Sequence, residues 1–218
     1  MIGVIRAVRS WPRRVKDSVS QEGLGSFALR MVLWRAYRAG VILAKPLAPP
    51  AGQADVQLRV ASTDDVLALL AVRSVYTAET LQSWLRDGEE CILGLVNGAI
   101  AAHRWVKTGI FRMPHLGLLL DLREDEISVH DVYVMPDFRG RGITAAANHT
   151  FDAPYLERGF RMEFSYATAG RGPWGRGHAY GIASIRTLRL GPFRKFWVKA
   201  LGPEAEYWQE RLKELRWA

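Results

Sequence analysis

The 218-residue sequence contains a single cysteine, Cys91. One cysteine excludes an internal disulfide and argues against a cysteine-rich metal site. It lies in the apolar run Cys91–Val96, which is typical of a small buried side chain. His103, His115 and His149 show no ligand-like spacing and have no paired acids nearby, so we expect no metal site.

Long apolar runs are absent as well. The nearest approach to one, residues 26–44, is interrupted by Arg30, Arg35 and Arg38, so no transmembrane helix is predicted. The first six residues lack the apolar core and cleavage site of a secretory signal, and none is predicted. We therefore expect a cytoplasmic protein, with peripheral attachment at the inner face of the membrane as an open alternative.

Neither of the common nucleotide-binding motifs is complete. No Walker A sequence occurs, which argues against a P-loop nucleotidase. Gly140-Arg141-Gly142 begins a dinucleotide fingerprint, with Ala145 at the third position. This partial match follows the fourth or fifth expected strand, and no acidic ribose ligand follows it, so a dinucleotide fold is not predicted.

The basic residues that are present lie in two blocks. The chain has 30 Lys and Arg and 22 Asp and Glu, for a formal net charge of +8. Residues 1–50 hold nine basic and two acidic residues, and residues 159–200 hold eight and one, whereas residues 51–158 hold ten and fifteen. Basicity confined to two blocks argues against nucleic-acid binding by the whole chain, so we expect no nucleic-acid partner.

The chain divides at the Pro-rich segment Pro46–Gly52. Residues 1–50 are expected to form a basic helical arm and linker, with a helix over Phe27–Leu43. That helix is expected to pack on the main domain or on a second copy in a homodimer, or to lie on an anionic membrane. Residues 51–200 are expected to form the main domain, and Pro203–Trp217, within residues 201–218, an amphipathic C-terminal helix.

The main domain is predicted to combine strands and helices in an α+β fold with a mixed sheet. Ser62 or Thr63 is expected to cap a helix, and Asn97-Gly98 is expected to form a hairpin turn. Further strands are expected near residues 56–60, 91–96, 99–106, 127–135, 161–167, 185–190 and 193–198, with further helices near residues 79–86 and 145–157.

The informative segment runs from His130 to Thr144. An apolar strand stops at Pro136, a loop containing Gly140 and Gly142 follows, and then a helix begins. Glycines let an anion approach the main chain, and the helix N-terminus presents N–H groups and a favourable dipole. This strand–loop–helix is typical of a phosphate or pyrophosphate site.

This segment resembles the GCN5-related N-acyltransferase superfamily, whose hallmark is Arg/Gln-x-x-Gly-x-Gly/Ala after a strand that often ends in Val-x-Pro. Here Val134-Met135-Pro136 is followed by Arg139-Gly140-Arg141-Gly142-Ile143-Thr144. Thr144 departs from the last hallmark position. The resemblance covers about residues 55–200 and implies a central, mostly antiparallel sheet flanked by helices.

The resemblance also implies acetyl-CoA or another acyl-CoA as co-substrate. Its pyrophosphate would lie on Arg139, Gly140, Arg141, Gly142, Ile143 and Thr144. Its pantetheine arm would run between the strands at 130–135 and 161–167, past Val134, and the backbone N–H of Val132 or Tyr133 would polarise the acyl carbonyl.

The catalytic groups are less well marked by the resemblance. Asp131 is the first candidate for the general base that deprotonates the amine, its neighbour His130 is the second, and Glu126 is the third. Alternation along a strand predicts that His130 and Asp131 point to opposite faces. Tyr180 or His178 would protonate the thiolate, although the family's usual Asn and Tyr positions are occupied here by Gly170 and Gly177.

These features together predict an acyl-CoA-dependent N-acyltransferase, with acetyl as the expected group and a small-molecule or protein amine as acceptor. The alternative is a non-catalytic acyl-CoA-binding or membrane-associated scaffold of the same fold. The basic segments are expected to contact a membrane surface or an acidic acyl-carrier protein.

Overall fold

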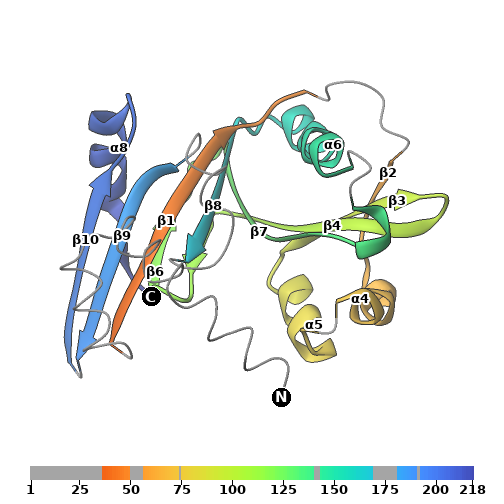
Figure 1. The fold of residues 1–218 in the computed structure, drawn as a ribbon, viewed down its shortest axis with the longest axis horizontal. Helices are drawn as coiled ribbons and strands as arrows, with labels where there is room; N and C mark the ends of the chain where they lie inside the picture. Colours follow the sequence, from red (N-terminus) through yellow and green to blue (C-terminus); the bar gives the residue numbers. More distant parts are fainter. Residues whose placement is uncertain (1–35, 50–55, 74, 140–142, 169–180, 191) are drawn as a thin grey trace, which may run out of the picture. The chain divides into compact units, whose positions relative to one another are not determined.

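The computed structural model describes residues 36–49, 56–73, 75–139, 143–168, 181–190 and 192–218 (Figure 1). The chain divides into two compact units. The first unit comprises residues 44–112 and 119–165, and the second unit comprises the described parts of segments 1–43, 113–118 and 166–218.

The first unit contains a mixed, mostly antiparallel sheet. Its strands follow the order β2 (Gln57–Val60), β3 (Glu90–Val96), β4 (Ala99–Thr108), β7 (Glu126–Val134) and β8 (Met162–Thr168, of which residues 162–165 belong to this unit). Only the pairing of β7 with β8 is parallel among these neighbours. Two short strands, β5 (Ile110–Met113) and β6 (Leu118–Asp121), lie between β4 and β7 in the chain. The expected α+β class is confirmed.

Helices cover both faces of this sheet. Helix α6 (Ile143–Glu157) contributes Phe151 and Tyr155 to an apolar cluster on one side, here called the α6 face. Helices α4 (Val66–Val72) and α5 (Ala78–Arg86) pack on the other side, the α4–α5 face (Figure 1). Successive residues of β3 alternate between the two clusters, because side chains along a strand point to opposite faces.

Local sequence signals define the ends of several elements. Ser62 accepts a hydrogen bond from the Asp64 amide and donates its own amide to Asp65, which forms a capping box at the start of the turn η1 (Thr63–Asp65) before α4. Asn97 and Gly98 both have positive φ angles, 52° and 78°, as a tight two-residue hairpin turn requires. The predicted cap and hairpin are therefore confirmed.

The second unit contains three antiparallel strands and the C-terminal helix. The strand order is β1 (Tyr37–Pro46, of which residues 37–43 belong to this unit), β9 (Gly181–Leu190) and β10 (Phe193–Ala200). Helix α8 (Ala205–Arg211) lies beside β9 and β10, and is followed by η4 (Leu212–Glu214) and β11 (Arg216–Trp217).

The helix predicted over Phe27–Leu43 is wrong from residue 37 onward, where the chain forms β1, while residues 27–35 lie outside the described residues. Tyr37, Ala39 and Ile42 are buried, and a Cβ at Gly40 would lie 3.0 Å from the carbonyl oxygen of Ala167. Pairing with β9 therefore decides the conformation from residue 37 onward, and the apolar periodicity that indicated a helix does not.

The C-terminal helix is also shorter than predicted. Helix α8 ends at Arg211, although the prediction extended to Trp217. Trp217 packs edge-on against Phe196 of β10, with ring centroids 5.7 Å apart, and it does so from the extended segment β11. The boundaries expected at residues 50 and 200 stay predictions. Within the described part of the chain, no helix is long and apolar enough to span a membrane.

Candidate active site

A β-bulge interrupts β7 at the predicted site. Trp105 of β4 pairs with His130 and His103 pairs with Tyr133, so Asp131 and Val132 together lie opposite a single residue of β4. The register shifts there, and Asp131 has a φ angle of +43°. Asp tolerates this left-handed conformation better than most residues, and bulges often lie at functional sites.

The bulge places two consecutive side chains on one face. His130 contacts Trp84 of α5, and Asp131 contacts Arg73, which directly follows α4. Both therefore lie on the α4–α5 face, and the prediction that they point to opposite faces is wrong. Side chains along a regular strand point alternately to the two faces of the sheet. The extra residue in β7 interrupts this alternation, so two consecutive side chains point to the same face at the bulge.

Asp131 is held by two donors. Arg73 Nη2 donates to Oδ1 at 2.8 Å, and His103 Nε2 lies 2.9 Å from Oδ2. The carboxyl side chain is only 7% exposed. Burial would raise the pKa of Asp131, but hydrogen bonds from His103 and Arg73 outweigh burial and hold the pKa well below its usual range. A carboxylate with so low a pKa is a weak base at neutral pH.

Tyr133 lies among cationic and aromatic groups that flank the bulge. The guanidinium carbon of Arg73 lies 4.2 Å from its ring centroid and that of Arg139 lies 5.1 Å away. The ring of His103 stacks beside it at 6.0 Å. Tyr76 is a further aromatic residue close to Asp131. Burial of its phenol and the nearby Asp131 carboxylate raise the pKa of Tyr76 to about 12. Tyr76 is therefore a neutral phenol at physiological pH.

His130 forms a second carboxylate–imidazole pair. Its Nε2 lies 2.6 Å from Glu89 Oε2, and Lys107 Nζ donates to Glu89 Oε1 at 3.0 Å. Burial would raise the pKa of Glu89, but hydrogen bonds from His130 and Lys107 lower it below its ordinary value. The carboxylate therefore stays ionised and favours the tautomer with a proton on Nε2, leaving a lone pair on Nδ1.

The two imidazoles differ in access. The His130 side chain is 33% exposed, and its ring packs edge-on against Trp84 at 4.8 Å. The His103 side chain is 1% exposed, and its buried Nδ1 has no hydrogen-bond partner among the residues that the structure describes. Of the two, His130 is the one that a substrate can reach.

One edge of β7 becomes free beside the bulge. Residues Glu126–Ser128 pair in parallel with Met162–Phe164 of β8. From Val129 onward, the described residues pair β7 with β4 only. Within the described part of the chain, the backbone groups on the other edge of the strand therefore have no strand partner over the stretch that contains the bulge.

The remaining predicted residues are placed only in part. Val132 is 47% exposed, and Arg139 Nε donates to the carbonyl of Val134 at 3.0 Å after the turn η2 (Pro136–Phe138). Helix α6 begins at Ile143, as the loop-to-helix prediction requires. Outside the described structure lie Gly140, Arg141, Gly142 and Tyr180, as well as the side chains of Ile143 and Thr144.

Glu126, the third candidate base, lies at the start of β7 and is buried. Its Oε2 accepts a hydrogen bond from the Arg123 amide at 2.9 Å, which closes the turn before the strand. This contact makes it a structural residue at the far end of the strand from the bulge. Among the described residues, no cluster of His, Cys, Asp or Glu could hold a metal ion.

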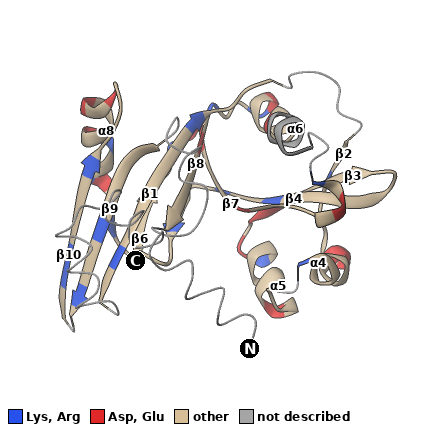
Figure 2. Cartoon of the chain, viewed as in Figure 1, with Lys and Arg blue, Asp and Glu red and all other residues tan. Residues whose placement is uncertain are grey.

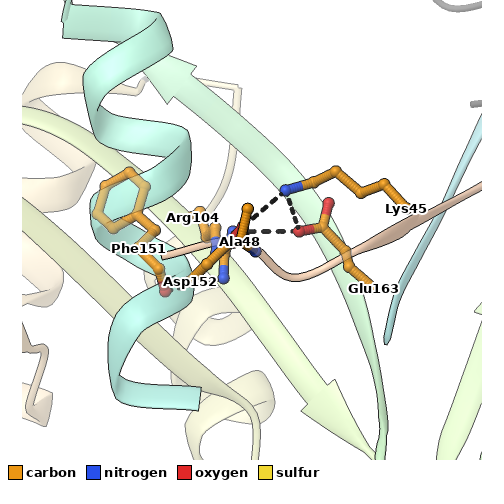
Figure 3. Close-up of polar contacts among 6 residues, drawn as sticks. All are labelled: Lys45, Ala48, Arg104, Phe151, Asp152 and Glu163. Carbon is orange, nitrogen blue, oxygen red and sulfur yellow. Dashed lines mark hydrogen bonds and ion pairs between the residues drawn. The ribbon is translucent and has the colours of Figure 1, made fainter. Parts of the chain in front are cut away.

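A buried charge network supports the bulge from the α6 face (Figure 3). Arg104, the residue opposite the bulge, donates to Asp152 Oδ1 at 2.8 Å and to the carbonyl of Phe151 at 2.9 Å. Lys45 Nζ donates to Asp152 Oδ2 at 2.9 Å, and both cations lie 3.2 Å from Glu163 Oε2. Two cations are thus balanced by two carboxylates, and they link β4 to α6 and β8.

Sequence reasoning missed Glu89, Arg73 and His103. Glu89 follows α5 in a Gly88-Glu89-Glu90 turn that looks solvated, and Arg73 lies in an interhelical connection. His103 lacked any metal-ligand spacing. His103 reaches the bulge through the pairing of β4 with β7, whereas Arg73 and Glu89 reach it through the packing of α4 and α5 on the sheet, and no local pattern signals these contacts.

No protein-family model matches the sequence, and no curated protein does. Among solved structures, the chain is similar to a functionally unknown conserved protein from Staphylococcus epidermidis ATCC 12228 (TM-score 0.46, 11% identity), over 67% of this chain and 58% of that chain. It is also similar to a GCN5-related glucosamine N-acetyltransferase region of a fungal multi-domain β-N-acetylglucosaminidase (TM-score 0.45, 15% identity), over 65% of this chain and 21% of that chain.

A third similar structure is a ribosomal-protein-alanine N-acetyltransferase from Brucella melitensis biovar Abortus 2308 (TM-score 0.36, 18% identity), over 48% of this chain and 74% of that chain. Two of these three proteins are acetyltransferases by name.

Proposed function

We propose that the chain is an acyl-CoA-dependent N-acyltransferase, with acetyl as the expected acyl group, and that the reaction takes place beside the bulge in β7. The observation that carries this proposal is the free edge of β7 from Val129 onward, which leads into the loop before α6. A free strand edge offers backbone donors and acceptors to an extended chain, and pantetheine is an extended chain with two amides. The helix N-terminus that follows suits the pyrophosphate.

The acceptor ammonium must lose a proton before its nitrogen attacks the thioester. Asp131 is unsuited to this step, since Arg73 and His103 already occupy its carboxylate. We assign the step to His130, whose exposed ring is oriented by Glu89. Glu89 is a positioning residue in this assignment, because it acts through the imidazole.

The group transfer then balances as follows in atoms and charge. The ammonium proton passes to Nδ1 of His130 and from there to water. The amine nitrogen then forms a bond to the acyl carbon, the carbon–sulfur bond breaks, and the second nitrogen proton passes to the vacated Nδ1, so that one proton in all is released to the solvent once the thiolate is protonated. The thiolate leaves as CoA and takes up a proton from Tyr180, His178 or water. The amide of Val132 or Tyr133 is proposed to stabilise the oxyanion, as backbone donors do in other acyl transfers.

The first experiment is thermal stabilisation by acetyl-CoA and by longer acyl-CoAs. We expect wild-type protein to be stabilised and Gly142→Trp to lose the effect, because an indole at this position would block the pyrophosphate. Release of the CoA thiol is then measured with a panel of amines, including glucosamine, lysine and an N-terminal peptide. Binding without amine-dependent thiol release would favour the non-catalytic acyl-CoA-binding scaffold, and no stabilisation by any acyl-CoA would contradict both functions.

A further inference from the structure

The hairpin of β9 and β10 in the second unit ends in an exposed apolar tip. Leu190 pairs directly with Phe193, and their side chains are 45% and 53% exposed. Directly opposed residues of an antiparallel pair project from the same face. Two large apolar side chains therefore stand together at the end of the hairpin, where burial by the rest of the unit is incomplete.

Basic residues occupy the positions next to this tip in both strands of the hairpin. Arg194 pairs with Arg189, and Lys195 follows, with both Arg194 and Lys195 exposed. The whole segment 181–200 contains five basic residues and no acidic one. Basic positions recur along both strands in Figure 2. The hairpin therefore ends in an apolar tip, Leu190 and Phe193, which is followed by basic residues at the next positions of both strands, Arg189, Arg194 and Lys195.

Strand β10 extends the same pattern away from the tip. It is the outermost strand in the order β1–β9–β10, and its residues Phe193, Lys195, Trp197 and Lys199 alternate onto one exposed face. Trp197 is 41% exposed, and Lys195 Nζ lies 5.2 Å from its ring centroid. The face combines aromatic side chains with cations over the length of the strand.

We propose that this face, the hairpin tip together with the exposed side of β10, docks on an anionic phospholipid bilayer. Leu190 and Phe193 enter the boundary between headgroups and acyl chains, and Lys195 and Lys199, which share the face of Phe193, lie against the lipid phosphates. Aromatic residues favour that boundary, and each cation near an anionic leaflet adds to the binding. Aliphatic Leu190 at the tip gives no stacking surface to a nucleic-acid base, which favours lipid over single-stranded nucleic acid.

Pairing of β10 with a second copy is disfavoured by the same charges. Edge strands with exposed Lys and Arg resist pairing with each other, because like charges then lie opposite one another. An anionic surface, by contrast, neutralises them. The proposal does not depend on the acyltransferase function, since it concerns residues of the second unit alone.

The test is co-sedimentation of the full chain with vesicles of phosphatidylcholine, with and without about one third phosphatidylglycerol. We expect wild-type protein to sediment with the anionic vesicles only. Replacing both tip residues, Leu190→Ser with Phe193→Ser, should weaken binding by about tenfold, since the apolar area no longer enters the bilayer. Reversing the charges on the docking face, Lys195→Glu with Lys199→Glu, should weaken it by more than about tenfold.

The matched control is Leu67→Ser, which removes an apolar side chain that is 77% exposed on α4 in the first unit. It should bind vesicles like wild type, and circular dichroism checks that every variant is folded. Equal binding to neutral and anionic vesicles, or a tip variant that binds like the control, would overturn the proposal. Tighter binding of a single-stranded oligothymidylate than of the vesicles would overturn it in favour of nucleic acid.

Discussion

His130 carries a prediction that separates base catalysis from structural support. His130→Gln should lower amine-dependent thiol release by about 10²- to 10⁴-fold, the usual contribution of a general base. Glu89→Gln should lower it less and should alter the pH–rate profile, because Glu89 positions the imidazole that accepts the proton. Both effects are measured as kcat/KM against pH, with acetyl-CoA binding as the reference.

The adjacent residue provides the matched control for Glu89. Glu90 accepts hydrogen bonds from Tyr155 and Arg158 instead of from His130. Glu90→Gln should therefore leave the pH profile of thiol release unchanged. A profile that shifts equally in both variants, or a His130→Gln protein with normal turnover and normal acetyl-CoA binding, would remove His130 from the role of base.

Asp131 is expected to matter more for the integrity of the bulge than for proton transfer. Asn tolerates the same left-handed backbone, so Asp131→Asn tests the charge without adding strain. We expect a loss of about 1–3 kcal/mol of unfolding free energy near pH 7, because Arg73 and His103 lose a buried ionic partner.

The sign of the pH dependence follows from the lowered pKa of Asp131. The carboxylate stabilises the fold fully above its unfolded pKa of about 3.9, and the contribution is lost as the pH falls below that value. The difference in unfolding free energy between wild type and Asp131→Asn, measured by urea denaturation, should thus shrink progressively as the pH falls below about 4. Asp137→Asn, at an exposed position after β7, is the control; a gap that stays constant with pH would contradict the assignment.

For individual residues, the sequence predicted which part of the chain forms the candidate site, but it did not predict how the side chains are arranged there. Asp131 and His130 were predicted because they precede the glycine loop, and both lie at the bulge. Their faces could not be predicted, because strand alternation assumes a regular register and one extra residue inverts it. Glu89 and His103 could not be predicted either, since Glu89 meets β7 only through the packing of α5 on the sheet and His103 only through strand pairing.

Among the elements, the charge network at Arg104 holds α6 against the sheet behind the bulge. Asp152 is fully buried, and Asp152→Asn would leave two cations facing Glu163 alone. We expect a loss of about 3–5 kcal/mol of unfolding free energy, the usual cost of breaking a buried pair from one side. Urea denaturation at neutral pH measures this loss.

A second substitution tests whether charge balance is the cause. Lys45→Met combined with Asp152→Asn restores neutrality, because one cation and one carboxylate then remain. The double variant should be more stable than the sum of the two single losses predicts. Strict additivity would show that the network acts through shape and hydrogen bonds and not through balanced charge.

The sequence predicted some of the helix caps, turns and strands correctly, but it missed strand β1. The caps, the Asn97-Gly98 turn and the strands around the glycine loop follow local rules, and the structure has them. Strand β1 could not be recognised, because Val41 and Ile42 continue an apolar periodicity that begins at Phe27 and is typical of a helix. Its conformation depends on pairing with β9, more than a hundred residues later in the chain.

Across the whole molecule, the net charge of +8 is unevenly divided. Residues 44–112 and 119–165 contain 12 basic and 16 acidic residues, whereas residues 36–43, 113–118 and 166–218 contain 11 and 4. The unit with the candidate active site is thus net acidic, and the unit with the exposed hairpin is net basic. Sequence blocks predicted this separation in outline, although they could not reveal that β1 and β10 share a unit.

The charge network of Lys45, Arg104, Asp152 and Glu163 gives its part of the fold a distinct response to heat. Hydration of charged groups becomes less favourable as temperature rises, so the cost of keeping these four side chains away from water falls on warming. The apolar clusters on the two faces of the sheet gain no comparable advantage. The ion pairs between α6 and the sheet are therefore expected to contribute a growing share of the unfolding free energy as the protein approaches its melting temperature.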